Sequence, residues 1–190
     1  MNREAPSQLE DPHQALDLAH RTRERVRRAL LRDAFAPFAM IWGAVWAVGF
    51  AASALYPSLA GPLWWVLDLL ALLACVALGR QHFRRVSHPD GLRLFWSWVA
   101  FATYLALLLF LAHPTSPVQG SMFLVVGLMA GYVVQGLWLW RGQAFLGLFL
   151  TALALLGGWL APTYYAWLMA ALGGGALLGT GLYLWIAFRP

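Results

Sequence analysis

GPLWWVLDLLALLACVALGR, residues Gly61 to Arg80, contains a single carboxylate, Asp68, and no basic residue before its last position. At about 1.5 Å per residue, a helix of this length crosses a hydrocarbon core roughly 30 Å thick. The stretch therefore predicts a transmembrane helix that carries one costly residue.

The composition of the whole chain is also that of a membrane protein. Of 190 residues, 61% are hydrophobic and 11% are charged, and the mean hydropathy is +0.65. So small a polar surface would not keep a folded domain in water. Charged residues are concentrated at the amino terminus, so we divide the chain into a cytoplasmic segment, residues 1–34, and a transmembrane domain, residues 35–190.

Six apolar segments in the second part are long enough to cross a bilayer. They predict an all-α polytopic membrane protein of six transmembrane helices in three hairpins. The spans are expected near residues 37–55, 62–79, 92–112, 118–140, 143–160 and 164–188. The connections between them alternate between short loops without arginine and segments that contain it.

That alternation predicts the orientation of the chain. All thirteen basic residues are arginines, and they lie before the first span, in the second and fourth connections, at the start of the third span or at the carboxyl end. Because basic residues are retained on the cytoplasmic side, we expect both termini in the cytoplasm.

An amphipathic helix is expected over about residues 12–33, with Asp11 and Pro12 at its start. Its narrow apolar stripe consists of Ala15, Leu18, Ala19, Thr22, Val26, Ala29 and Leu30. Such a helix suits an anionic leaflet, or it could bind a cytoplasmic protein or act only as a topology anchor. The arginines expected at the membrane surface are Arg21, Arg25, Arg28, Arg32, Arg84 and Arg85.

Asp68 shares one predicted helix face with the small residues Ala71 and Cys75, which turns it toward the bundle. Without an intramembrane arginine or lysine, its carboxyl group needs protonation or a hydrogen-bond partner. The candidate intramembrane polar site comprises Asp68, Ser53, Tyr104, Gln119 and Ser121. The site could serve proton coupling, or Asp68 could be a tolerated structural acid.

Close helix packing is expected where small residues recur four positions apart. The glycines expected at such contacts are Gly43, Gly49, Gly127, Gly131, Gly175 and Gly179. The triple glycine Gly173 to Gly175 also allows a broken helix that lines a substrate site. Gln135, on the same face as Gly127 and Gly131, is expected to form a hydrogen bond between helices.

No motif in the sequence predicts a reaction. The five histidines are scattered, and no Gly-x-Ser-x-Gly, His-Glu-x-x-His or phosphate loop occurs. An enzyme is therefore the least favoured class, and we expect no catalytic residue, metal or cofactor. Nucleic acid is not expected either, because the adjacent bilayer supplies an anionic surface for the arginines.

WGAVWAVGF, residues 42–50, contains the pattern Trp-Gly-x-x-Trp-x-x-Gly-Phe. Together with the basic amino-terminal helix and the glycine cluster at Gly173 to Gly175, it resembles a group of small bacterial six-span membrane proteins to which no activity is assigned. The resemblance implies a protein of the bacterial inner membrane and transfers no site residue.

Two functions of different classes follow as hypotheses. The leading one is a non-enzymatic interaction, sensory or regulatory component that acts through its cytoplasmic amino-terminal helix. The alternative is a small transporter or proton-coupled carrier that uses Asp68. The expected partners are the lipid bilayer with its anionic headgroups at the cytoplasmic face, a cytoplasmic protein bound by residues 12–33, and a second copy of the chain.

Overall fold

The computed structural model describes residues 12–83 and 89–188, and every element in these two ranges is helical. The longer helices are α1 (Pro12–Leu30), α2 (Ala36–Leu55), α3 (Pro57–Phe83), α4 (Pro89–Ala112), α5 (Pro117–Trp138), α6 (Arg141–Leu160) and α8 (Gly175–Ala187). Between them lie the π-helical turns η1 (Leu31–Phe35) and η3 (Met169–Gly174), the 3-10 turn η2 (Pro162–Tyr164) and the short helix α7 (Tyr165–Leu168).

In the described residues, five helical stretches are long and apolar enough to cross a membrane. They are Ala15–Leu55, Pro57–Arg80, Pro117–Trp138, Arg141–Leu160 and Pro162–Ala187. Helix α4 has 24 residues, and its apolar stretch within the residues whose side chains are described is Trp96–Ala112. The prediction of an all-helical chain with several membrane-length helices is confirmed at this level of detail.

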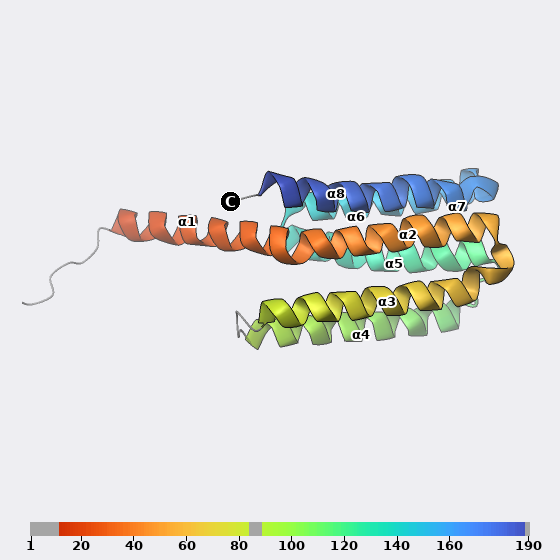
Figure 1. Ribbon diagram of the computed structural model, residues 1–190, viewed down its shortest axis with the longest axis horizontal. Coiled ribbons are helices and arrows are strands. Elements are labelled where there is room, and N and C mark those ends of the chain that lie inside the picture. Colours follow the sequence, from red (N-terminus) through yellow and green to blue (C-terminus); the bar gives the residue numbers. More distant parts are fainter. Residues whose placement is uncertain (1–11, 84–88, 189–190) are drawn as a thin grey trace, which may run out of the picture.

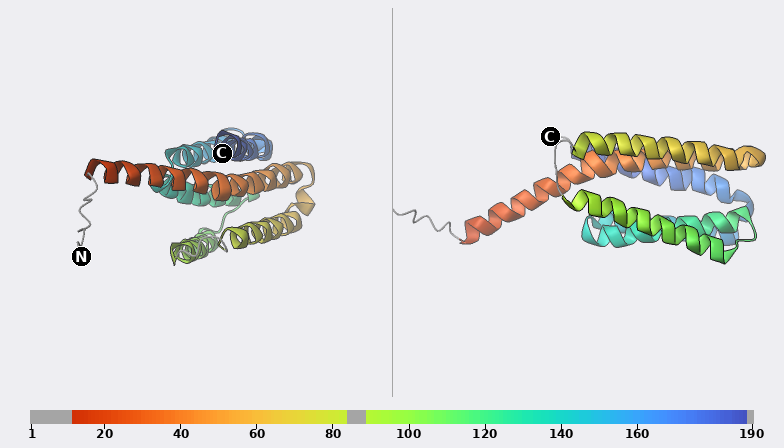
Figure 2. Two further views of the ribbon diagram at one scale, coloured as in Figure 1. Left: turned by 60° about the vertical axis from the view of Figure 1, so that its left-hand side comes forward. Right: turned by 90° about the horizontal axis from the view of Figure 1, so that it is seen from below.

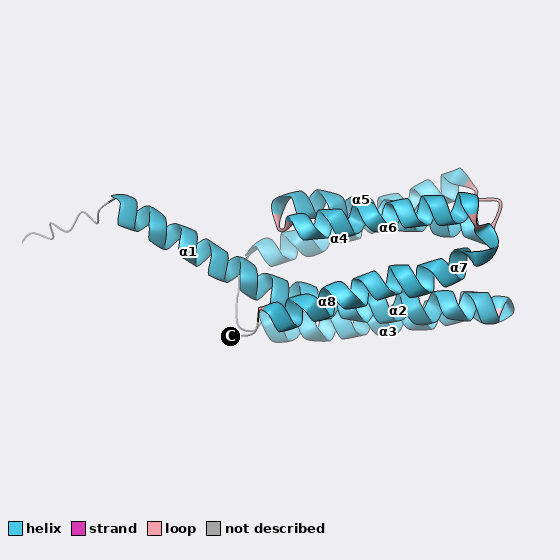
Figure 3. Ribbon diagram, turned by 90° about the horizontal axis from the view of Figure 1, so that it is seen from above, coloured by secondary structure: helices cyan, strands magenta, loops and turns pink. Residues whose placement is uncertain are grey.

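The helices form an elongated bundle of two groups (Figures 1 and 3). In the first group α2 packs against α3 and α8, and in the second α5 packs against α4 and α6. The core lies between α2, α5, α6 and the last helical stretch, where Met129, Leu150, Met169 and Leu177 are almost fully buried. The molecule is thus held together at its centre, while α3 and α4 lie at its periphery.

Helix α1 continues through η1 into α2 without a loop, and it projects beyond the end of the bundle (Figures 1 and 2). Every side chain described in α1, from residue 15 to residue 30, is exposed. Leu31 is the first buried residue. The predicted start of the helix at Asp11 lies outside the described residues.

Helix α1 enters the bundle at the same end at which α8 leaves it (Figure 1). The end of α3, with Arg80, and the start of α6, with Arg141, lie at this end too. The short connections at Tyr56, at residues 113–116 and at Ala161 lie at the opposite end. All arginines whose side chains the structure describes are therefore at or beyond one end of the bundle.

Candidate functional sites

Asp68 is half-buried on α3, on the side of the helix that carries the buried Ala71. Among the described residues it has neither a hydrogen bond nor an ion pair. Trp65 and Leu72, one turn before and one turn after Asp68, are 81% and 54% exposed, so Asp68 lies at the edge of the buried side of α3 and its direction into the bundle stays a prediction. The structure leaves its carboxyl group without the partner that was expected.

Two of the expected partners of Asp68 bond to other groups. The indole nitrogen of Trp64 donates to Ser53 Oγ at 3.0 Å, and Ser53 Oγ donates to the Gly49 carbonyl oxygen at 2.8 Å. Ser121 Oγ and the Tyr165 hydroxyl lie 3.0 Å apart and share a hydrogen bond between α5 and α7. Both hydroxyls therefore link neighbouring helices and do not contact the acid.

The other two expected partners do not reach Asp68 either. Gln119 Oε1 accepts from the backbone nitrogen of Thr115 at 2.8 Å and from its hydroxyl at 2.9 Å, while Ser116 Oγ accepts from the Gln119 backbone nitrogen at 3.2 Å. These bonds satisfy the amino-terminal end of α5. The Tyr104 side chain is 70% exposed. The five-residue polar site predicted from matching depths is not assembled in the structure.

Four of the six predicted packing glycines lie at helix contacts. A Cβ atom on Gly43 would lie 2.6 Å from the backbone nitrogen of Leu178, and one on Gly49 would lie 2.7 Å from the Trp64 ring. Gly127 packs against Leu105 and Gly131 against Trp98, so both join α5 to α4. The predicted close packing at these four positions is confirmed.

The prediction for Gly175 and Gly179 is wrong, because a Cβ atom at either would meet nothing within 4 Å. The last span packs through Gly174 and Gly181 instead, where a Cβ atom would lie 2.7 Å from the Ala47 backbone nitrogen and 2.7 Å from the Ala36 carbonyl oxygen. One residue step rotates a helix by about 100°, so a spacing rule alone does not identify the contacting face.

The triple glycine does not break the last span. Gly173 and Gly174 are buried within the π-helical turn η3, and the chain continues directly into α8. Gly173 faces the ring of Trp46, and Gly174 faces the backbone of Ala47. The last span is therefore continuously helical at the triple glycine, and Gly173 and Gly174 allow close contact with α2.

The two amides Gln135 and Gln143 connect α5 and α6. Gln143 Nε2 donates to Gln135 Oε1 at 2.7 Å, which confirms the predicted interhelical role of Gln135. Gln143 is only 1% exposed, and its own Oε1 atom has no hydrogen-bond partner among the described residues. Gln143 was not predicted as a contact residue, because a polar residue beside the basic connection at Arg141 is also expected at the end of a span.

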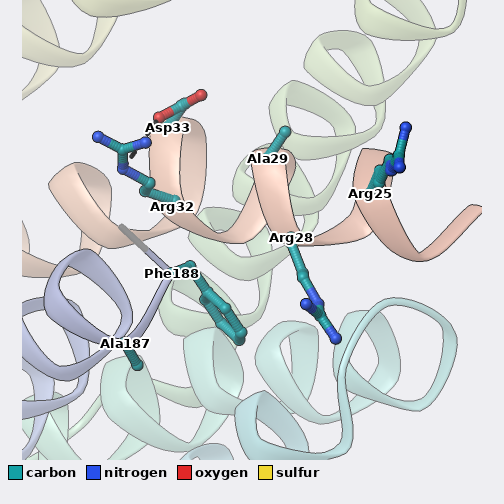
Figure 4. A pocket seen from close by; sticks show the side chains of 7 residues that line it. All are labelled: Arg25, Arg28, Ala29, Arg32, Asp33, Ala187 and Phe188. Atoms are coloured by element: carbon teal, nitrogen blue, oxygen red, sulfur yellow. Dashed lines mark ion pairs between the residues drawn. The ribbon is translucent and has the colours of Figure 1, made fainter. Parts of the chain in front are cut away.

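A pocket of about 500 Å³ lies where α1 and η1 meet the end of α8 (Figure 4). Its lining residues are Arg25, Arg28, Ala29, Arg32, Asp33, Ala187 and Phe188. Three of the six predicted membrane-surface arginines are thus gathered around one pocket. Arg21 is exposed elsewhere on α1, and Arg84 and Arg85 lie outside the described residues.

Arg32 is the arginine of this pocket that the fold holds most firmly. Its guanidinium carbon lies 5.5 Å from the centroid of the Trp185 ring, within range of a cation–π interaction. Its Nε atom lies 3.7 Å from Asp33 Oδ1 and is buried, with no hydrogen-bond partner in the part of the chain that the structure describes. The sequence did not predict the contact with Trp185, because these residues are 153 positions apart in the chain.

Among the described residues, no group of three or more histidine, cysteine, aspartate or glutamate side chains is arranged to hold a metal ion. Comparison of the chain with protein-family models, with curated proteins and with solved structures finds no match. The resemblance based on residues 42–50 therefore stays a prediction.

Proposed function

We propose that this chain is a six-span protein of the bacterial inner membrane, with three helical hairpins and both termini in the cytoplasm. The described arginines gather at one end of the bundle, where α1 enters and α8 leaves, and the short connections at the other end contain none. The positive-inside rule assigns the arginine-bearing end to the cytoplasm.

We further propose that the protein is a non-enzymatic interaction or regulatory component that acts through α1. The observation that carries this proposal is that α1 is amphipathic and wholly exposed along its described side chains, although it continues into the central helix α2. Within Pro12–Leu30, five arginines accompany two carboxylates, so the partner with complementary charge is an acidic protein surface.

The direction of the apolar stripe supports a partner outside the bundle. Leu31, which packs into the bundle, follows Val26 by five residues, which places the two side chains about 140° apart around a helix. Because α1 also runs on from α2 and projects beyond the bundle end, this arrangement favours a cytoplasmic protein over a flat position on the leaflet.

The orientation can be tested by labelling single cysteines in a Cys75→Ser background. We expect Ser58→Cys and Thr163→Cys, at the arginine-free end, to react with a membrane-impermeant maleimide added to intact spheroplasts. Thr22→Cys in α1 should react only after the membrane is opened. Labelling of Thr22→Cys in closed spheroplasts would reverse the proposed topology.

The role of α1 can be tested with a photo-crosslinking amino acid at Val26, in the stripe, or at His20, about 120° around the same helix. We expect a discrete protein adduct from position 26 only, and its loss when the neighbouring stripe residue is changed by Thr22→Asp. Adducts with lipid from position 26 would place α1 on the leaflet instead. Equal protein adducts from both positions would contradict a specific interface.

The carboxyl group of Asp68 is half-buried and has no partner among the described residues, which supports a second candidate function, a small proton-coupled carrier. In that case Asp68→Asn should abolish pH-dependent proton flux in proteoliposomes, measured with an enclosed pH-sensitive dye. Glu24→Gln, which removes a carboxylate from exposed α1, serves as the matched control. Equal flux in the Asp68→Asn variant and the unchanged protein would leave Asp68 a structural acid.

A further inference from the structure

The pocket at the base of α1 concentrates positive charge between two segments far apart in the sequence. Arg25, Arg28 and Arg32 come from α1 and η1, and Ala187 and Phe188 come from the carboxyl end of α8 and the residue after it. Among the described lining residues Asp33 contributes the single carboxylate, so these residues carry an excess of two positive charges. In Figure 4, Arg28 and Phe188 extend to the same side of the α1 ribbon.

These positive charges are poorly neutralised within the protein. The ion pair of Arg28 with Glu24, one turn earlier, has a distance of 3.7 Å, and both side chains are more than 60% exposed. Solvent screens such a pair, which leaves the guanidinium group available to a stronger acceptor. Arg32 is paired with Asp33 only at 3.7 Å, and Trp185 holds its side chain, 28% of which remains exposed.

We propose that this pocket binds an anionic phosphate group, presented by the headgroup of a phospholipid or by free phosphate. Guanidinium groups recognise phosphate with paired hydrogen bonds, and three arginines are among the residues that line a volume of about 500 Å³. Ala187 and Phe188 add an apolar wall next to the last span, which suits the glycerol and acyl portions of a lipid.

The bound phosphate group would also connect α1 to the bundle, apart from any binding of a partner protein by α1. It lies between the helix that projects from the bundle and the end of the last span, with the π-helical turn η1 beside it. Its negative charge bridges the arginines of α1 to Arg32 in η1, whose side chain lies over Trp185 of α8. The occupied pocket therefore adds a contact between α1 and the end of α8 to the continuous helix that already connects α1 to α2.

The test uses the purified full-length protein in mild detergent and counts bound lipids by native mass spectrometry. Phosphatidylglycerol is the probe, and diacylglycerol with the same acyl chains is the control that lacks a phosphate group. Arg25→Gln/Arg28→Gln removes two charges from the pocket. Arg21→Gln/Arg23→Gln removes two charges from exposed positions of the same helix that do not line the pocket.

We expect the pocket variant to retain at least fivefold less phosphatidylglycerol than the unchanged protein. The control variant should retain as much phosphatidylglycerol as the unchanged protein. Equal losses in the two variants would show general attraction to a basic helix and overturn the proposal. Equal retention of diacylglycerol and phosphatidylglycerol would overturn it too.

A second arm distinguishes the two sources of the phosphate group. Inorganic phosphate in millimolar amounts, compared with chloride at equal ionic strength, should displace phosphatidylglycerol from the unchanged protein if the pocket recognises the phosphate itself. Binding of inorganic phosphate without retention of phosphatidylglycerol would assign the pocket to free phosphate. Failure of both probes to bind would overturn the proposal, and the crosslinking of α1 at Val26 would be unaffected by that failure.

Discussion

Helix α3 and the last helical stretch, Pro162–Ala187, are both membrane-length, yet they pack very differently. Within its most apolar window α3 has the higher mean hydropathy, 2.0 against 1.4, but only 6% of its residues there are buried, against 39% in the last stretch. In a bilayer, lipid solvates apolar side chains as well as protein does, so hydropathy predicts insertion but not burial.

Small residues explain the difference. Gly174 and Gly181 bring the last stretch against α2, and Gly43 on α2 receives Leu178 from the other side. On α3, contact with α2 relies on the ring of Trp64 over Gly49 and on the buried Ala71. Its outer leucines, such as Leu69 and Leu70, are more than half exposed. Close approach of backbones therefore distinguishes the core helices from the peripheral ones.

The largest expected effect comes from removing one leucine side chain in each region. Leu177→Ala should lower the free energy of unfolding by about 2 kcal/mol or more, because Leu177 is 1% exposed and its removal leaves a cavity. Leu70→Ala on α3 should change it by less than about 0.5 kcal/mol. Detergent-induced unfolding of the two variants would measure this, and equal losses would refute the proposed difference between the two helices.

An intermediate effect is expected from adjacent glycines in the last span. Gly174→Ala should destabilise the protein by about 1–3 kcal/mol, because the added methyl group meets the Ala47 backbone. Gly175→Ala should be neutral or stabilise it by up to about 1 kcal/mol, because its side faces open space. Thermal unfolding of the two variants in detergent measures the difference. A larger loss of stability in Gly175→Ala than in Gly174→Ala would show that the contacting face of the last span is not the one that carries Gly174.

The smallest effect is expected at the amide pair of α5 and α6. Gln143→Leu removes the donor to Gln135 Oε1 and should cost about 1 kcal/mol. Gln135→Leu/Gln143→Leu should cost less than the sum of the two single changes, since no amide then stays unpaired in the interior. A double-mutant cycle on unfolding free energies measures the coupling, and strict additivity would mean that the bond contributes nothing.

Much of the helical pattern was predictable, because crossing a bilayer requires long apolar runs that are visible in the sequence. The packing roles of Gly43, Gly49, Gly127 and Gly131 followed from their spacing. The polar partners of Asp68 could not be predicted in this way, because the depth of a residue along a helix does not determine the direction in which its side chain points around that helix. Ser53 has the depth expected of a partner for Asp68, yet it points to Trp64.

The sequence by itself determined that the chain is helical and apolar, that its arginines belong at one end, and that α1 is amphipathic. These properties depend on composition and periodicity along the chain, which are local. Only the tertiary structure decided that Gly174 rather than Gly175 meets α2, that Gln143 pairs with Gln135, and that Arg32 lies over Trp185. Such contacts depend on how helices rotate and approach one another, and residues distant in the chain set that geometry together.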